Sequence, residues 1–213
     1  MIITYYGKQF FKISHGDLTI AINPPAKESK VLDKPVRFGS NVVLVTTNHI
    51  DYNGVDQVTH GETVPFIVSG PGEYEIGGTF IKGAMTETVI DNKKYVNTSY
   101  SFAVDGINLC FLGVCSNEKE LIKVKDILGE VDVLFLPIGG GSVFGAQEAE
   151  KVSLGFEPKI VIPMDYGTDM GPKVLEAYLK ESGTEKSTPV PKLVLKKKDL
   201  DGKDGEVIVL EKE

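Results

Sequence analysis

The spacing of apolar positions changes partway along the chain, and this change predicts two successive kinds of structure. The first part is dominated by short runs of β-forming residues separated by glycines and polar turns, a pattern typical of β-meanders. These runs span residues 2–6, 10–14 and 18–22, followed by 42–45, 65–69 and 79–83. The run at 42–45 is continuous rather than alternating, so we expect a strand that is buried on both faces.

The middle of the chain carries a strong hairpin signal. Residues 99–104 and 107–113 are apolar-rich runs joined by Asp105-Gly106, a dipeptide that favours the two-residue turns of β-hairpins. The stretch 86–97 before them is polar and contains Asp91-Asn92, so it predicts a connection between strands. We therefore expect the β-rich half of the chain to close near residue 113.

Beyond residue 116 the apolar residues adopt helical spacing. Asn117 and Glu120 form a capping box for a helix that runs to Gly129. The apolar stripe of this helix consists of Leu121, Val124, Ile127 and Leu128. Further predicted elements are a strand at 132–138, a helix at 146–156, a strand at 159–164, a helix from Gly171-Pro172 to Gly183, and strands at 193–195 and 206–210. Alternation of helix and strand predicts βαβ units.

Composition limits the classes of function. With 213 residues, 41% of them hydrophobic, the chain can build a sizeable core, which we assign to a single domain, residues 1–213. No apolar run is long enough to span a bilayer and the N-terminus lacks a signal-peptide pattern, so we expect a cytoplasmic protein without a membrane partner. A net charge of −7, with Arg37 as the sole arginine, argues against a nucleic-acid partner. Cys110 and Cys115 are predicted to be reduced core residues.

The predicted strand at 42–45 breaks into a polar loop, residues 46–54, that contains His49 and Asp51. Ligands in layered α/β folds bind beyond the carboxyl ends of such strands. Histidine and aspartate are also side chains that serve as metal ligands or acid–base groups. This loop is therefore the candidate site around which the rest of the chain is interpreted.

The order of residues in the loop resembles a motif of the metallo-β-lactamase-fold hydrolases, an apolar strand followed by His-x-His-x-Asp-His-x-Gly. His49, Asp51 and Gly54 match the second histidine, the aspartate and the glycine. Thr47 stands in place of the first histidine, and Tyr52 in place of the third. The resemblance implies an α/β fold, a four-layer α/β/β/α sandwich of metallo-β-lactamase type, and a chemistry in which one or two metal ions activate a water molecule.

The resemblance extends along the chain, and so does the replacement of ligands. Lys8 stands where the family has the histidine of a Gly-His-Ser phrase, and Asn23 where it has the aspartate of an Asp-Pro phrase. Val114 stands where a metal-bridging aspartate is expected, and Asp165 replaces the histidine of Pro-Met-His-Tyr. The phrase GPGEYEIGG at 70–78 resembles one in the small branch of the family that includes the ascorbate-phosphate-lactonase-like proteins.

His49, Asp51 and Asp165 are the metal ligands that remain, and one imidazole with two carboxylates makes at best a single oxygen-rich site. The first hypothesis is a catalytically inactive member of the fold, kept as a binding or assembly module for a small molecule or a protein, with no cofactor. The alternative is a metal-dependent hydrolase with a rebuilt mononuclear site for manganese or zinc, acting on a phosphoester, lactone or thioester. A homo-oligomer is compatible with both.

The alignment also makes a geometric prediction. Six residues should converge in one shallow cleft, namely Thr47, His49, Asp51, Tyr52, Val114 and Asp165. Two facing carboxylates, Asp51 and Asp165, raise the pKa of one of them unless a cation intervenes. Lys8 is the available cation, and we expect its ammonium within about 4–6 Å of one carboxylate. A solvated lysine on a turn is the alternative interpretation of Lys8.

Other polar groups are weaker candidates for chemistry. His15 lies in a predicted turn and His60 in a predicted loop, so both are expected on the surface. Glu73 and Glu75 alternate along a strand, which places them on one solvated face. The glycines at 139–141 lack the Gly-Lys-Ser/Thr that completes a phosphate loop, and they predict a tight turn.

Overall fold

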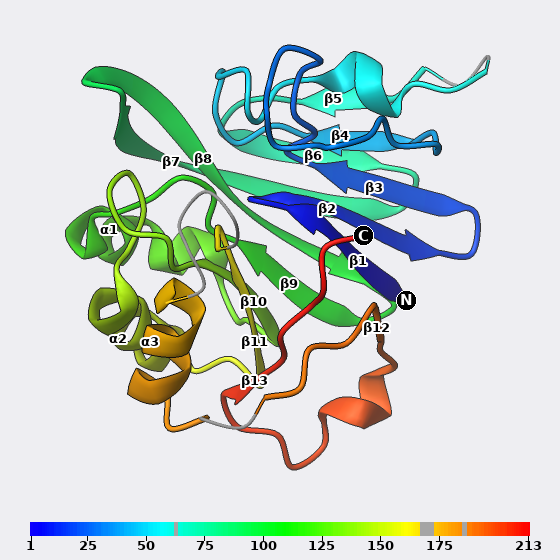
Figure 1. Ribbon diagram of the computed structural model, residues 1–213. Helices are drawn as coiled ribbons and strands as arrows, with labels where there is room; N and C mark the ends of the chain where they lie inside the picture. The colour runs from blue at the N-terminus through cyan, green and yellow to red at the C-terminus, as the bar shows by residue number, and fades with distance from the viewer. Residues whose placement is uncertain (62–63, 167–172, 185–186) are drawn as a thin grey trace.

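The computed structural model describes residues 1–61, 64–166, 173–184 and 187–213. Two β-sheets pack face to face, and the largest apolar cluster of the protein, which includes Ile3, Phe11, Ile81, Phe111 and Phe135, fills the space between them. Figure 1 shows helices α1, α2 and α3 together on one side of the second sheet. The architecture is the predicted α/β sandwich of metallo-β-lactamase type.

The first sheet has the strand order β12-β1-β2-β3-β4-β5 within the described residues. Its strands are β1 (Ile2–Gly7), β2 (Phe10–His15), β3 (Leu18–Ile22), β4 (Val42–Leu44), β5 (Phe66–Val68) and β12 (Leu193–Val194). Strands β1 to β3 form the predicted antiparallel meander, and β4 pairs in parallel with both β3 and β5. All three residues of β4 are buried, as the continuous apolar run predicted.

The second sheet has the order β13-β11-β10-β9-β8-β7-β6 in the same part of the chain. Its strands are β6 (Gly72–Ile76), β7 (Thr79–Ile90), β8 (Lys93–Val104), β9 (Ile107–Phe111), β10 (Val133–Pro137), β11 (Ile160–Met164) and β13 (Glu206–Val207). Strands β9, β10, β11 and β13 are mutually parallel, whereas β6 to β9 are antiparallel. The βαβ units expected after residue 116 therefore complete this sheet.

The polar stretch 86–97 is wrongly predicted as a connection. Strands β7 and β8 run through it as one long hairpin that turns at Asp91 and Asn92, both with positive φ. Side chains on one face of this ribbon, including Met85, Val89 and Val96, are exposed. Because neither the alternation nor the charge of this segment resembles a buried strand, local sequence hid a hairpin that long cross-strand pairing creates.

The three helices cover the outer face of the second sheet. They are α1 (Glu118–Leu128), α2 (Ala146–Phe156) and α3 (Lys173–Glu181), and they pack on a second apolar cluster. Asn117 caps α1 by accepting from the Lys119 N–H at 3.0 Å, while Glu120 pairs with Lys123. Leu121, Val124 and Leu128 are buried as predicted, but Ile127 is 47% exposed. The predicted start of the last helix at Gly171-Pro172 lies outside the described residues.

The outer layer over the first sheet is made differently. A loop that contains Leu32, Val36 and Phe38, together with the 3-10 turn η1 (Val55–Val58), packs on the side chains of β1, β2, β3 and β4 that point away from the second sheet. None of the helices in the described part of the chain is long and apolar enough to cross a membrane. The fourth layer of the sandwich is thus largely irregular chain.

The last strands do not pair with each other. β12 pairs with β1 in the first sheet, and β13 pairs with β11 in the second, with the 3-10 turn η2 (Lys197–Leu200) between them. The chain then returns beside β1, where the N–H of Glu213 donates to the carbonyl oxygen of Tyr5 at 2.9 Å. Figure 1 shows this end of the chain next to β1. The tail therefore joins both sheets along one edge of the sandwich.

Candidate functional site

The carboxyl ends of five strands meet at one edge of the sandwich, and each is followed by a polar or displaced motif residue. Lys8 follows β1, Asn23 follows β3, the loop 46–54 follows β4, Val114 follows β9 and Asp165 follows β11. Parallel strands present their carboxyl ends on the same side of a sheet, so the topology brings residues from all parts of the sequence together. The predicted convergence is therefore a consequence of strand direction.

Three residues at this edge have left-handed backbone conformations although none is glycine. These are Lys8 (φ 51°), Asn23 (φ 52°) and Asp165 (φ 63°). Such conformations are uncommon outside glycine and cost free energy unless surrounding contacts hold them. Here the N–H of Asp165 donates to the carbonyl oxygen of Lys8 at 2.7 Å, which ties two of the three strained residues to each other. Strain of this kind concentrates at functional sites.

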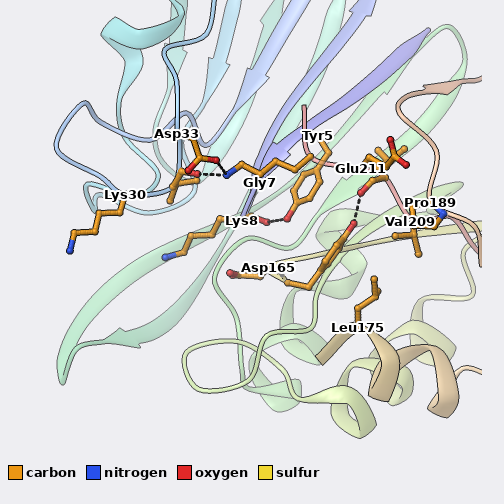
Figure 2. Close-up of a pocket in the computed structure, with 14 residues that line it drawn as sticks. Tyr5, Gly7, Lys8, Lys30, Asp33, Asp165, Leu175, Pro189, Val209 and Glu211 are labelled. Carbon is orange, nitrogen blue, oxygen red and sulfur yellow. Dashed lines mark hydrogen bonds and ion pairs between the residues drawn. The ribbon is translucent and has the colours of Figure 1, made fainter. Parts of the chain in front are cut away.

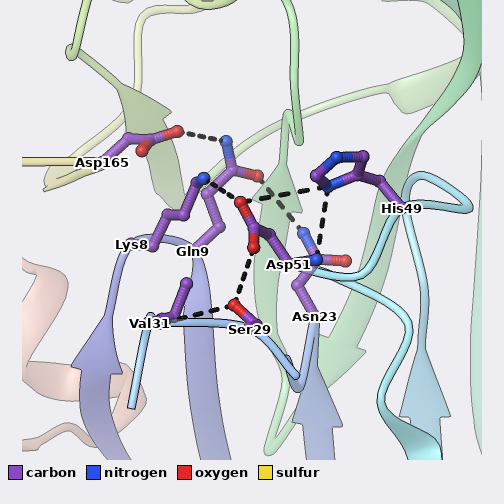
Figure 3. A network of polar contacts seen from close by, with 8 residues as sticks. All are labelled: Lys8, Gln9, Asn23, Ser29, Val31, His49, Asp51 and Asp165. Carbon is purple, nitrogen blue, oxygen red and sulfur yellow. Dashed lines mark hydrogen bonds and ion pairs between the residues drawn. The ribbon is translucent and has the colours of Figure 1, made fainter. Parts of the chain in front are cut away.

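Asp51 is the centre of an ionic group (Figure 3). The Lys8 ammonium donates to Oδ2 of Asp51, and the Ser29 hydroxyl donates to Oδ1 at 2.6 Å. Nδ1 of His49 lies 3.9 Å from Oδ2 and accepts from the backbone N–H of Asp51 at 3.3 Å. The expected contact between Lys8 and a carboxylate is present, and both Asp51 oxygens are occupied by protein donors.

Gln9 connects the two halves of the site and has no exposed surface. Its Nε2 donates to Oδ2 of Asp165 at 2.8 Å and lies 3.3 Å from the carbonyl oxygen of Gly113. Its Oε1 accepts from the Asn23 amide at 3.2 Å, and Asn23 also donates to the Thr46 hydroxyl at 2.9 Å. Sequence reasoning did not select Gln9, although its position directly after Lys8 at a strand break was a usable signal.

A second amide, Asn97, holds the floor of the site and was also missed. Its Oδ1 accepts from the Val114 N–H at 2.8 Å and from the Thr47 hydroxyl at 3.2 Å. Its Nδ2 donates to the Thr86 hydroxyl and the Leu112 carbonyl oxygen, both at 2.9 Å. Asn97 lies in the stretch that was predicted to be a connection, so its inward position became visible only with the β7/β8 hairpin.

Tyr52 and Val114 form the apolar side of the site. Both are buried in a small cluster with Ile90 and Val143. The Lys8 ammonium lies 5.2 Å from the centre of the Tyr52 ring, within the range of a cation–π contact. The His49 ring lies 5.9 Å from the Tyr52 ring. At two positions where the resembled motif has metal ligands, this chain thus has an aromatic ring and an aliphatic side chain.

The two carboxyl groups titrate in opposite directions. Partial burial raises the pKa of Asp51, but hydrogen bonds from Lys8 and Ser29, with the charges of Lys8 and His49, outweigh it and hold the pKa below its ordinary value. Full burial raises the pKa of Asp165, and the Lys8 charge and the Gln9 hydrogen bond do not offset this. The site therefore holds an ionised Asp51 and an Asp165 that resists ionisation.

The predicted residues converge, but not in a shallow cleft. Thr47, Tyr52, Val114 and Asp165 are buried, and only His49 and Asp51 retain partial exposure. A cavity of about 470 Å³ reaches the site from the side of the C-terminal segment, where Lys8, Asp165 and Tyr166 line it (Figure 2). Access therefore comes past the ends of β1 and β11 rather than over the loop 46–54.

The other histidines and glutamates lie elsewhere. His15 and His60 are exposed, and His15 is 3.8 Å from Asp105 at the far end of the strands. Glu73 and Glu75 are exposed on one face of β6, as expected. Cys110 and Cys115 are buried free thiols. None of these groups contributes to the network around Asp51.

The donor set does not fit the pair of ions that the resembled chemistry uses. Among the residues that the structure describes, no group of three or more His, Cys, Asp and Glu side chains is arranged to hold a metal ion. Both oxygens of Asp51 and one of Asp165 already accept hydrogen bonds, and the ammonium of Lys8 carries the charge that an ion would bring. An ion could bind to His49, Asp51 and Asp165 only after Lys8 had moved away.

Comparison with known proteins places the chain among metal-dependent hydrolases. A domain model described as a beta-lactamase superfamily domain matches residues 2–165. A UPF0173 metal-dependent hydrolase of Listeria innocua is 26% identical over 202 residues, which are 79% of this chain and 86% of that protein. A second, from Lysinibacillus sphaericus, is 27% identical over 199 residues, again 79% and 86% of the two chains.

A solved structure agrees with these sequence relatives. A proposed Zn-dependent hydrolase of the metallo-beta-lactamase superfamily from Thermotoga maritima is 27% identical, with a TM-score of 0.74 and coverage of 99% of this chain and 98% of that one. These names correct one prediction. The expectation of no cofactor is overturned, because the relatives are named as metal-dependent and one as zinc-dependent.

Proposed function

This chain belongs to the beta-lactamase superfamily, and from that premise we propose that it is a member whose site binds a ligand instead of carrying out two-metal hydrolysis. The ligand is a small molecule or a protein segment that reaches the edge where the strands end. The observation that supports this most directly is the Lys8 ammonium bonded to Asp51, close to the ring of Tyr52.

Lys8 favours binding for an electrostatic reason. Its side chain is 27% exposed and that of Asp51 20%, so the pair is partly desolvated, and a divalent ion beside the ammonium would meet a like charge. Removing either partner would leave a charge in a partly buried position, which is unfavourable. The pair therefore acts as a fixed positive and negative group that a polar ligand can recognise.

The surroundings of Lys8 suit a small ligand. The cavity that reaches Lys8 and Asp165 has a volume of about 470 Å³, within the range of small-molecule sites. Its wall combines apolar side chains, Tyr166, Leu175 and Val209 among them, with a few polar groups. This composition gives contact area from the apolar wall and orientation from Lys8 and Asp165.

A second candidate function is supported by the names of the relatives. In it the chain is a metal-dependent hydrolase in which His49, Asp51 and Asp165 hold one divalent ion, manganese or zinc, after Lys8 has turned away. Its substrate would be a phosphoester, lactone or thioester. The bound ion would supply an activated water molecule.

A comparison of wild-type protein with Lys8→Met tests the proposal. Methionine keeps much of the lysine stem and removes the charge, which frees Asp51 for an ion. We expect manganese or zinc to raise the melting temperature of Lys8→Met more than that of the wild type. We also expect wild-type protein purified without chelator not to hydrolyse phosphodiester, lactone and thioester probes. Lys93→Met, at the exposed start of β8, is the matched control.

The two functions predict opposite results. Stoichiometric manganese or zinc in the wild type, measured by mass spectrometry, with hydrolysis of a probe that chelation abolishes, contradicts the binding proposal and supports the hydrolase. An equal response of wild type, Lys8→Met and Lys93→Met to the ions would show that the ammonium does not compete with a metal. That result would remove the electrostatic argument for binding.

A further inference from the structure

We infer that a second site, formed by the loop after β3 and the C-terminal segment, binds a small organic phosphate with an apolar body. The site is a cavity of about 500 Å³. Its lining includes four basic side chains, Lys12, Lys34, Arg37 and Lys212. It lies on the outer side of the first sheet, where irregular chain takes the place of helices.

The charges of this cavity differ from those of the whole protein. The chain has a net charge of −7, yet the cavity lining carries the four basic side chains against two acidic ones, Asp33 and Glu213. Within the described parts of the chain, Lys12, Lys34 and Arg37 have no carboxylate within 4.0 Å, whereas Lys212 pairs with Asp33 at 2.8 Å. Gathered cations without carboxylate partners repel one another, and a bound anion relieves that repulsion.

The head group that fits is a phosphate. The excess of two basic side chains matches the charge of a phosphate monoester at neutral pH. Arg37 is the only guanidinium in the protein, and guanidinium groups make paired hydrogen bonds to phosphate oxygens. An isolated carboxylate would satisfy only part of this charge.

The body of the ligand is set by aromatic rings on the same wall. Phe38 and Tyr6 line the cavity, their ring centres are 5.4 Å apart, and Phe38 also stacks on Phe10 at 6.1 Å. The Lys12 ammonium lies 4.7 Å from the centre of the Phe38 ring. A planar ring on the ligand can pack beside Phe38 while its phosphate faces Lys12 and Arg37.

Lys212 is held in position by the main chain around it. Its ammonium donates to the carbonyl oxygen of Val31 at 3.1 Å as well as to Asp33, the contact drawn beside Gly7 in Figure 2. Gly7 has a φ of 108°, and a side-chain carbon there would lie 3.1 Å from Cε of Lys212. Because Gly7 leaves this space open, the lysine stem passes over β1 and places its charge between the two cavities.

The test uses phenyl phosphate, inorganic phosphate and benzyl alcohol as probes, with calorimetry at low ionic strength because exposed charges are screened by salt. We expect phenyl phosphate to bind more tightly than either of the other two. Lys12→Met with Arg37→Met should weaken phenyl phosphate binding about tenfold or more, the loss expected for charged hydrogen bonds. Lys93→Met with Lys94→Met, on the exposed start of β8, is the control and should leave binding unchanged.

Phe38→Ala separates the two parts of the proposal. It should weaken phenyl phosphate binding and leave inorganic phosphate binding unchanged, and circular dichroism checks that the variant is folded. Absence of phenyl phosphate binding to the wild type, or a loss as large in the control as in the Lys12 and Arg37 variant, overturns the inference. So does a loss with Lys8→Met alone, which would place the ligand in the other site. The result is independent of whether the Asp51 site binds or hydrolyses a ligand.

Discussion

Two buried aspartates lie at opposite ends of the second sheet, and they differ in how the protein treats their charge. Asp132 precedes β10 and is surrounded by donors, with Lys159 at 2.7 Å, the Asn108 N–H at 2.9 Å and Lys197 at 3.4 Å. Asp165 follows β11, and its carboxyl group accepts one hydrogen bond, from Gln9, among the contacts of the described residues. One end of the sheet satisfies a carboxylate fully and the other does not.

The pKa values follow from this difference. Burial raises the pKa of Asp132, but the hydrogen bonds from Lys159 and Asn108 and the charges of both lysines hold it below its ordinary value. Burial raises the pKa of Asp165, and its weaker compensation leaves the value above the ordinary one. Asp132 therefore behaves as a structural ion pair, whereas Asp165 retains unused capacity to interact with a ligand or an ion.

The largest effect is expected at the structural end. Asp132→Asn should lower the free energy of unfolding at pH 7 by about 2 kcal/mol, because the two lysines lose their partner. Since the folded pKa lies below the unfolded one, the stabilisation is present above about pH 4 and is lost as the pH falls through the folded value. Urea unfolding of variant and wild type at pH 7 and at pH 3 measures the difference.

Asp126→Asn, on the exposed face of α1, is the control for Asp132→Asn and should change stability by less than about 0.5 kcal/mol. A loss of the same size for Asp132→Asn at both pH values would contradict the ion-pair interpretation. It would instead point to packing of the carboxyl group as the source of the stabilisation.

At the other end the sign is reversed. Asp165→Asn should raise the free energy of unfolding by about 1 kcal/mol at pH 8, because it removes a buried carboxylate and because asparagine tolerates the left-handed backbone at this position. A folded pKa above the unfolded one means that the wild type loses stability as the pH rises through the folded value. The gain should therefore disappear at about pH 4 and below.

Unfolding of Asp165→Asn and wild type between pH 4 and pH 8 checks this prediction and sharpens the functional choice. A variant that is less stable than the wild type at pH 8, in protein purified without chelator, would indicate that the carboxylate binds an ion. That outcome would favour the mononuclear hydrolase.

The smallest effect is expected at His49. Its side chain is 16% exposed and makes one weak hydrogen bond, from the Asp51 N–H at 3.3 Å. His49→Ala should therefore lower the free energy of unfolding by less than about 1 kcal/mol. A loss above about 3 kcal/mol, measured by urea unfolding, would mean that His49 belongs to a buried network or to a metal site, and the two ends of the sheet would then resemble each other.

The sequence by itself determined the elements and the positions that could carry chemistry. Short-range signals such as the continuous apolar run at β4, the turn at Asp105-Gly106 and the cap at Asn117 act over a few residues, and the structure contains each of them. The motif comparison likewise selected Lys8, Asp51 and Asp165 because strand order fixes which loops share an edge.

Only the tertiary structure decided how those positions are occupied. The β7/β8 hairpin forms through pairing along its whole length, and this pairing brings Asn97 beside Thr47 and Val114. Gln9 became the link between Asn23 and Asp165 because strands distant in sequence end side by side. The ionisation of Asp132 and Asp165 depends on how many donors reach each carboxyl group, and that number is set by packing between segments rather than by any local pattern.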